Sequence, residues 1–144
     1  MIYTEMTKLA LKICFEVHKD QVDKSGLPYA FHPFHIAEQM ENEDEIITAL
    51  LHDVVEDGGY TLSDLAALGF SERVIDAIDH LTHREGVSYE DYVAKIAECE
   101  LARTVKLADL KHNSDLSRLS PDEIHDAALE RWERYQRAIK QLSE

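Results

Sequence analysis

The chain has 144 residues, with 29 Asp and Glu against 15 Lys and Arg, which gives a formal net charge of -14. Nucleic-acid-binding proteins present basic faces to phosphates, so this charge argues against a general nucleic-acid binder. At 44% hydrophobic and 31% charged residues, the chain can bury a core, and its length suits one domain over residues 1–144. No apolar stretch approaches the ~18 residues of a membrane span, so no membrane-spanning helix is expected.

The cysteines and the N-terminus bear on the cellular compartment. Cys14 and Cys99 form no CxxC pair and are too few for a disulfide framework. The first residues also lack the basic and apolar segments of a signal peptide. Together these features predict a reduced, cytoplasmic protein, and they leave its oligomeric state open.

The N-terminal part of the chain predicts two helices separated by a loop. Apolar residues between Met6 and Val17 recur at the i, i+3, i+4, i+7 spacing of an amphipathic helix, which ends near Asp20. Residues 22–28 contain glycine and proline and are expected to form a loop. A short helix should then begin at His32–Pro33, because proline suits the first helical position.

The middle of the chain predicts one longer helix and two short ones. Asn42 has the side chain of an N-cap, and the helix that it opens is expected to continue through Val55 and end at Gly58–Gly59. Thr61 and Ser71 are expected to cap the two short helices that follow.

The C-terminal part predicts three more helices. Residues 82–86 are expected to form a loop, after which Ser88 caps a helix. The next helix runs from Leu101 towards His112, and Ser120–Pro121 should open a last helix that continues towards Leu142. No convincing strand was found, so the sequence predicts an all-α fold, a single helical bundle.

Ionisable residues concentrate in residues 51–59. On one continuous helix, His52 and Glu56 would be four residues apart, as would Asp53 and Asp57. The preceding residues are almost wholly apolar, and an uncompensated charge on a buried helix costs several kcal/mol. Three carboxylates and an imidazole without a nearby basic residue therefore indicate a metal cation. The alternative is an acidic last turn facing solvent, which would oppose the helix dipole.

Two other places can complete such a site. His32 precedes a proline at the expected start of a helix, and Asp109 follows an apolar run. Asp109 and Asn113 are four residues apart, so both can point into one pocket. Alone, neither place is diagnostic, because single His, Asp and Asn residues usually lie at the surface.

Taken together, His32, His52–Asp53 and Asp109 resemble the H…HD…D metal pattern of the HD-domain phosphohydrolases. Within that superfamily the likeness is to the RelA/SpoT-type hydrolases, and it spans nearly the whole chain. Three blocks carry it: Lys24-Ser25-Gly26-Leu27-Pro28-Tyr29-Ala30-Phe31-His32-Pro33, His52-Asp53-Val54-Val55-Glu56-Asp57, and Val105-Lys106-Leu107-Ala108-Asp109 with His112-Asn113.

The resemblance implies the all-α HD-domain bundle and a small alarmone hydrolase, an enzyme that removes the 3′-pyrophosphate of ppGpp to give GDP. A chain of 144 residues has no room for the synthetase domain of bifunctional members, so synthetase activity is not expected. The resemblance also implies a divalent metal ion, commonly Mn²⁺, although the donor set suits Fe²⁺ or Zn²⁺ as well. The four ligands that it implies are His32, His52, Asp53 and Asp109.

The same resemblance implies further roles. Glu56 and Asp57 correspond to the pair that positions and activates the attacking water. Lys24, Ser25 and Asn113 correspond to residues that contact the nucleotide, whereas Tyr29 is expected to pack.

Two departures from the family pattern bear on the base. Asp23 occupies the position of a basic residue that helps to hold the base, and a carboxylate cannot make a cation–π contact to a purine. Leu110–Lys111 also alters the family's Asp-Arg-Leu-His-Asn motif. The metal positions and the acidic pair are intact, so hydrolysis is expected while the base stays open.

Two alternatives remain. One is a general HD-domain nucleotidase or phosphatase, including one that removes the 2′-phosphate of NADPH. The other is a non-catalytic module that binds nucleotide. In each case a small anionic ligand must approach an acidic protein, so its capture depends on local positive charge. The metal and Lys24 would supply it, with Lys106, Lys111 and Arg118 as further sources.

Overall fold

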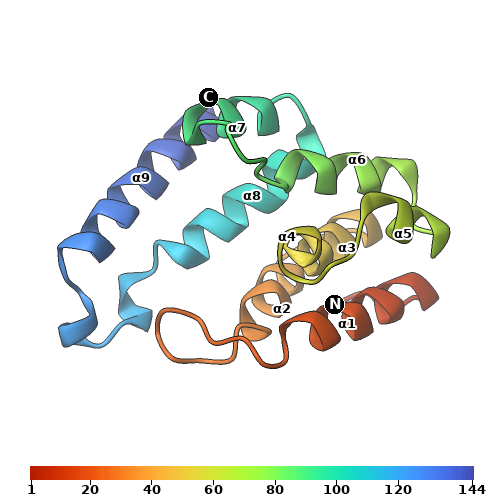
Figure 1. The fold of residues 1–144 in the computed structure, drawn as a ribbon, viewed down its shortest axis with the longest axis horizontal. Helices are drawn as coiled ribbons and strands as arrows, with labels where there is room; N and C mark the ends of the chain where they lie inside the picture. The colour runs from red at the N-terminus through yellow and green to blue at the C-terminus, as the bar shows by residue number, and fades with distance from the viewer.

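The structure is a computed structural model that describes residues 1–144, and it is built from helices alone (Figure 1). The all-α prediction is confirmed, and the only β-pairing is an isolated bridge between Val22 and Pro28. No helix has both the length and the apolar character needed to cross a bilayer. The helices are α1 (Glu5–His18), α2 (Phe31–Glu38), α3 (Glu43–Leu51), α4 (Val54–Asp57), α5 (Leu62–Ala67), α6 (Glu72–Leu81), α7 (Tyr89–Ile96), α8 (Glu100–Asn113) and α9 (Asp126–Ser143), with 3-10 turns η1 (Leu116–Arg118) and η2 (Pro121–Glu123).

Helix α3 lies at the centre of the core. Residues 46–51 are all buried, as expected for a helical segment that is apolar except for Thr48. Helices α1, α2, α6 and α8 pack around it, and α9 packs along the outer side of α8 (Figure 1). This arrangement brings α8 against α2 and the C-terminal end of α3, although α8 is far from both in the sequence.

Four predicted N-caps are confirmed by hydrogen bonds. Asn42 Oδ1 accepts from the amide of the third helical residue at 3.0 Å, as does Thr61 Oγ1. Ser71 and Ser88 accept in the same way at 3.2 and 3.1 Å. Each cap satisfies one of the amides that lack a partner in the first turn of a helix. These boundaries were predictable because the interaction spans only three residues.

The predicted continuous helix from Asn42 to Gly58 is wrong, because it breaks at His52–Asp53. Asp53 has φ -110° and ψ 0°, outside the helical region, and α4 begins after it. A ring nitrogen of His52, Nδ1, lies 2.6 Å from the Ala49 carbonyl oxygen within the last turn of α3. The chain direction therefore changes at the two residues expected to bind metal.

Two other helix starts differ from the prediction. Helix α2 begins at Phe31, so Pro33 is its third residue, where a missing amide is equally harmless because the first-turn amides have no helical partner. Ser120 and Glu123 do form the expected capping box, but it closes only the η2 turn. Ile124 then leaves the helical region at ψ 84°, and α9 starts at Asp126 with His125 as its N-cap.

Candidate functional site

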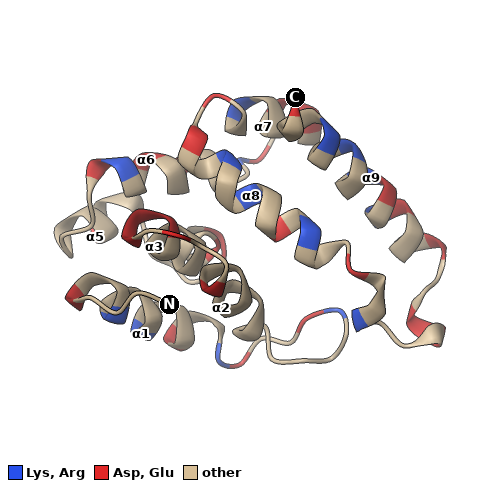
Figure 2. Ribbon diagram, turned by 180° about the vertical axis from the view of Figure 1, so that it is seen from behind, with Lys and Arg blue, Asp and Glu red and all other residues tan.

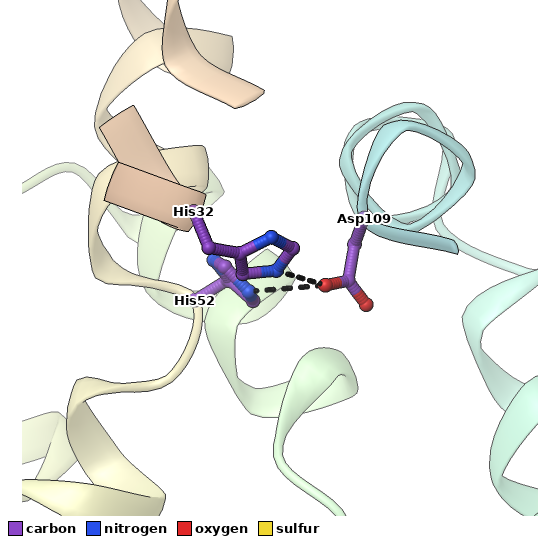
Figure 3. Close-up of side chains that lie close together, drawn as sticks. All are labelled: His32, His52 and Asp109. Carbon is purple, nitrogen blue, oxygen red and sulfur yellow. Dashed lines mark hydrogen bonds and ion pairs between the residues drawn. The ribbon is translucent and has the colours of Figure 1, made fainter. Parts of the chain in front are cut away.

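Three of the predicted metal-ligating side chains meet in the interior. His32 on α2, His52 at the end of α3 and Asp109 on α8 each offer a ligand atom within 4.8 Å of the others (Figure 3). Asp109 Oδ1 is 2.7 Å from His32 Nε2 and 3.5 Å from His52 Nε2. All three residues are buried, and we call them the His–Asp cluster.

Asp53, the fourth predicted ligand, lies beside this cluster and is not one of the three. Its Oδ2 is 3.1 Å from His52 Nε2, which makes no hydrogen bond although it is buried. A carbonyl can only accept, so the contact with Ala49 places the proton of the His52 ring on Nδ1. Nε2 then directs a lone pair towards the carboxylates of Asp53 and Asp109. Such an arrangement suits a cation, so the residues present fit a divalent metal ion.

A second layer of side chains holds the two carboxylates. The Tyr29 ring packs beside those of His18 and His32, as expected, and its hydroxyl also donates a hydrogen bond to Asp53. Lys106 Nζ lies 2.8 Å from Asp109 Oδ2, and Asn113 Nδ2 donates to Asp109 Oδ1 at 3.2 Å. Burial alone would raise the pKa of Asp109, but the positive charge of Lys106 and contacts from His32 outweigh it and keep the pKa well below its usual range.

His112 supports His32 from the opposite side. Their Nδ1 atoms are 2.6 Å apart and the rings stack with centroids 4.9 Å apart. The ring of His35 lies 4.2 Å from that of His112. Burial and then the charge of His32 lower the pKa of His112 to about 4. The contact orients the His32 ring with Nε2 towards Asp109, in the manner of an outer-shell partner of a metal ligand.

Glu56 and Asp57 lie on α4, at the exposed edge of the site. Glu56 Oε1 accepts a hydrogen bond from the backbone amide of His83 at 2.6 Å, which ties α4 to the loop after α6. Partial burial, followed by the negative charge of Asp53, raises the pKa of both carboxyl groups. Because the helix breaks before α4, the continuous polar stripe expected from His52 to Asp57 does not form.

His18 is a buried neighbour that sequence reasoning left without a role. It is fully buried at the end of α1, its ring lies 4.8 Å from that of Tyr29, and its Nε2 has no hydrogen-bond partner. One signal could have placed it: His18 follows Cys14 by four residues, so it continues the buried stripe of α1.

The three residues predicted to contact the nucleotide share one cleft. Lys24, Ser25 and Asn113 line a cleft of about 280 Å³, together with Tyr29. Since Tyr29 and Asn113 also touch Asp53 and Asp109, the cleft adjoins the His–Asp cluster. Arg131 of α9 also lines it and was not predicted, because nothing in the sequence relates α9 to residues 22–28.

Comparison with known proteins places this site in context. No family model matches the sequence. The chain is 30% identical over 127 residues to a probable GTP pyrophosphokinase of Mycobacterium leprae, covering 79% of this chain and 16% of that protein. It is 30% identical over 144 residues to the bifunctional (p)ppGpp synthase/hydrolase SpoT of Escherichia coli K12, covering 88% and 20%. It is 32% identical over 139 residues to the guanosine-3′,5′-bis(diphosphate) 3′-pyrophosphohydrolase of Haemophilus influenzae, covering 85% and 20%.

A solved structure extends the comparison to the fold. It is that of a metazoan SpoT orthologue that hydrolyses ppGpp, and it superposes with a TM-score of 0.79 at 20% identity, covering 99% of this chain and 87% of that one. The chain is an HD-type domain related to SpoT. This HD-type domain matches about a fifth or less of the length of the curated relatives, and the low identity to the solved structure limits that comparison to the fold.

Proposed function

We propose that residues 1–144 form one HD-type phosphohydrolase domain that removes the 3′-pyrophosphate from ppGpp-like nucleotides. The observation that carries the proposal is the convergence of His32, His52 and Asp109 from three helices beside Asp53. Relatives whose names include (p)ppGpp hydrolase activity support the reaction class.

The His–Asp cluster and Asp53 would hold a divalent cation, for which we propose Mn²⁺. Two imidazoles with two carboxylates also suit Fe²⁺ or Zn²⁺, so the donor set alone does not select one ion. When bound, such a cation lowers the pKa of a coordinated water towards neutrality and offsets phosphate charge.

Glu56 and Asp57 would carry the proton transfers. Their raised pKa values bring these carboxyl groups closer to neutral pH, which suits general acid–base catalysis. In the proposed reaction Glu56 accepts a proton from the attacking water. The protonated member of the pair then gives a proton to the 3′-oxygen as its bond to phosphorus breaks. The hydrogen bond from the His83 amide keeps the Glu56 carboxylate in one position.

Lys24, Ser25 and Asn113 would position the nucleotide, because they line the cleft that adjoins the His–Asp cluster. The Ser25 hydroxyl donates its proton to Asp23 Oδ1 at 2.6 Å, so Ser25 would contact the ligand only as an acceptor, through its oxygen lone pairs. The Asp23 carboxylate is already bonded to Ser25, Leu27 and Arg118. We assign no base to the nucleotide.

A Mn²⁺-supplemented turnover panel tests the proposal, with ppGpp, ppApp, NADPH and simple nucleotides as substrates and products identified by mass. We expect pyrophosphate release from ppGpp or ppApp. Asp53→Ala should abolish it, and Glu130→Gln, an exposed carboxylate change on α9, should not. Orthophosphate from many monophosphates or from NADPH would instead identify a general nucleotidase. Nucleotide that stays bound and uncleaved with Mn²⁺ would identify a non-catalytic module.

A further inference from the structure

A second group of metal-ligating side chains lies outside the His–Asp cluster. Asp76 and His80 lie one turn apart on α6, and Cys99 is the residue that precedes α8. Each of the three offers a ligand atom within 4.8 Å of the others. Figure 2 shows the first turns of α8 beside α6, so the packing of these two helices brings Cys99 to Asp76 and His80. We call the three residues the Asp–His–Cys group.

The separation of sulfur and carboxylate in this group is close to that around a bound metal ion. Cys99 Sγ lies 3.9 Å from Asp76 Oδ2. In a tetrahedral zinc site, with Zn–S and Zn–O bonds of about 2.3 and 2.1 Å, these two ligand atoms are about 3.6 Å apart. The two side chains therefore need to approach by only a few tenths of an ångström to share one ion.

The His80 ring is oriented by the backbone of its own helix. Its Nδ1 lies 2.8 Å from the Asp76 carbonyl oxygen. Because a carbonyl can only accept, Nδ1 carries the ring proton and Nε2 carries the lone pair that binds a metal. A hydrogen bond from the other ring nitrogen to a backbone carbonyl is typical of histidines that ligate metal ions.

Other partners do not account for the Asp–His–Cys group. Asp76 forms no ion pair with lysine or arginine, and Arg73, one turn before it on α6, instead pairs with Asp44 at 2.9 Å. Cys99 occupies the N-cap position of α8 but makes no capping hydrogen bond through its side chain. The carboxylate and the thiol are therefore both available to a cation.

The sulfur ligand selects the kind of ion. Thiolates suit Zn²⁺ and other borderline or soft ions, whereas Mn²⁺ prefers oxygen ligands. We propose that Asp76, His80 and Cys99 bind Zn²⁺ and thereby tie α6 to the start of α8. Cys99 binds as the thiolate and releases its proton to solvent, and water completes the coordination in the fourth position. This site is separate from the His–Asp cluster and does not rest on the proposed hydrolysis.

Titration of Co²⁺ into the full, metal-free chain tests the site by spectroscopy. Co²⁺ bound to a thiolate gives an ultraviolet charge-transfer absorption, which the nitrogen and oxygen ligands of the His–Asp cluster cannot give. We expect this absorption to develop, and Zn²⁺ to remove it by displacing Co²⁺. Cys99→Ser should abolish it, and His80→Gln should weaken Co²⁺ binding at least about tenfold. Asp79→Asn, a change on the same helix to a carboxylate that pairs with Arg84, should leave the absorption unchanged.

Alkylation of the wild-type chain tests the same site without a variant. Cys14 is buried, which raises its pKa to about 12, so Cys99 is the thiol that reacts with iodoacetamide. We expect Zn²⁺ to slow the alkylation of Cys99, located by peptide mass, and Mn²⁺ to leave it unchanged. The site would be overturned by a lack of charge-transfer absorption at millimolar Co²⁺, by its persistence in Cys99→Ser, or by alkylation at the same rate with and without Zn²⁺.

Discussion

Two regions of the molecule pair carboxylates with nitrogen groups. One is the His–Asp cluster, and the other is the Asp23–Arg118 clasp, the ion pair in which Asp23 Oδ2 accepts from Arg118 Nη2 at 2.8 Å. The two regions are built differently. The side chains of the cluster are at most 6% exposed and project from helices that pack in the core. Those of the clasp are 13% and 20% exposed and belong to a loop and a 3-10 turn. Burial makes the cluster depend on complete pairing, whereas the clasp can lose one partner to water. Substitutions in the two regions should therefore differ in size and in what they change.

The largest effect is expected from Asp109→Ala. It removes a proposed metal ligand and leaves Lys106 buried without its partner, so we expect activity to vanish and the free energy of unfolding to fall by about 3–5 kcal/mol. Urea denaturation of the metal-free chain measures the second effect. Asp44→Ala, which breaks the exposed pair with Arg73, should cost at most about 1 kcal/mol. If both variants lose the same free energy of unfolding, the loss of its Asp109 partner does not destabilise Lys106.

Glu56→Gln should affect catalysis and spare the fold. We expect kcat to fall by roughly 10²- to 10⁴-fold with little change in KM, because the lost group acts on a proton. The raised pKa of Glu56 means that its ionised, basic form appears only as pH rises through that value. The wild-type rate should therefore climb with pH there, and the residual rate of Glu56→Gln should lack that dependence. If Glu56→Gln instead raises KM and leaves kcat unchanged, Glu56 binds substrate and does not transfer a proton.

Tyr29→Phe should weaken the site more gently. Removing the hydroxyl takes a hydrogen bond from Asp53, and loss of an outer-shell partner typically lowers metal affinity by about 10- to 100-fold. Titration of free Mn²⁺ followed by electron paramagnetic resonance gives the dissociation constant. Tyr60→Phe is the matched control, because the Tyr60 hydroxyl makes no hydrogen bond and its ring also packs on the core. If both variants bind Mn²⁺ as the wild type does, Tyr29 has no part in the site.

Asp23→Asn should have the smallest effect, and it should depend on pH. Burial alone raises the pKa of Asp23, but hydrogen bonds from Ser25 and Leu27 and the charge of Arg118 outweigh it, so the folded pKa is below 3.8. The ionised carboxylate therefore stabilises the fold above pH 3.8, by about 1 kcal/mol, and this contribution is lost as pH falls through the lowered pKa.

The measurement for Asp23→Asn is the difference in unfolding free energy from the wild type between pH 7 and pH 3. That difference should shrink towards zero at the acid end. Asp122→Asn, an exposed change in η2, should show a smaller difference at pH 7. A difference that is constant with pH would mean that the clasp is not held by charge.

Much of the fold followed from local patterns in the sequence. The caps at Asn42, Thr61, Ser71 and Ser88 and the apolar spacing of α1 involve residues three or four apart, so they were readable without the tertiary structure. The break at His52–Asp53 was not readable in this way. The apolar residues of α3 and α4 continue the helical spacing across it, whereas in the structure Asp53 leaves the helical region and α4 packs against α1.

The same division applies to the functional residues. Sequence alone determined that the chain is helical and pointed to His32, His52, Asp53 and Asp109, because a motif resemblance needs only residue order and spacing. Only the tertiary structure decided that Tyr29 holds Asp53, that Arg118 engages Asp23, and that Arg131 reaches the cleft beside Lys24. The packing of α2 against α3 brings Tyr29 to Asp53, whereas Arg118 and Arg131 reach residues 22–28 because η1 and α9, which follow α8, lie beside that loop.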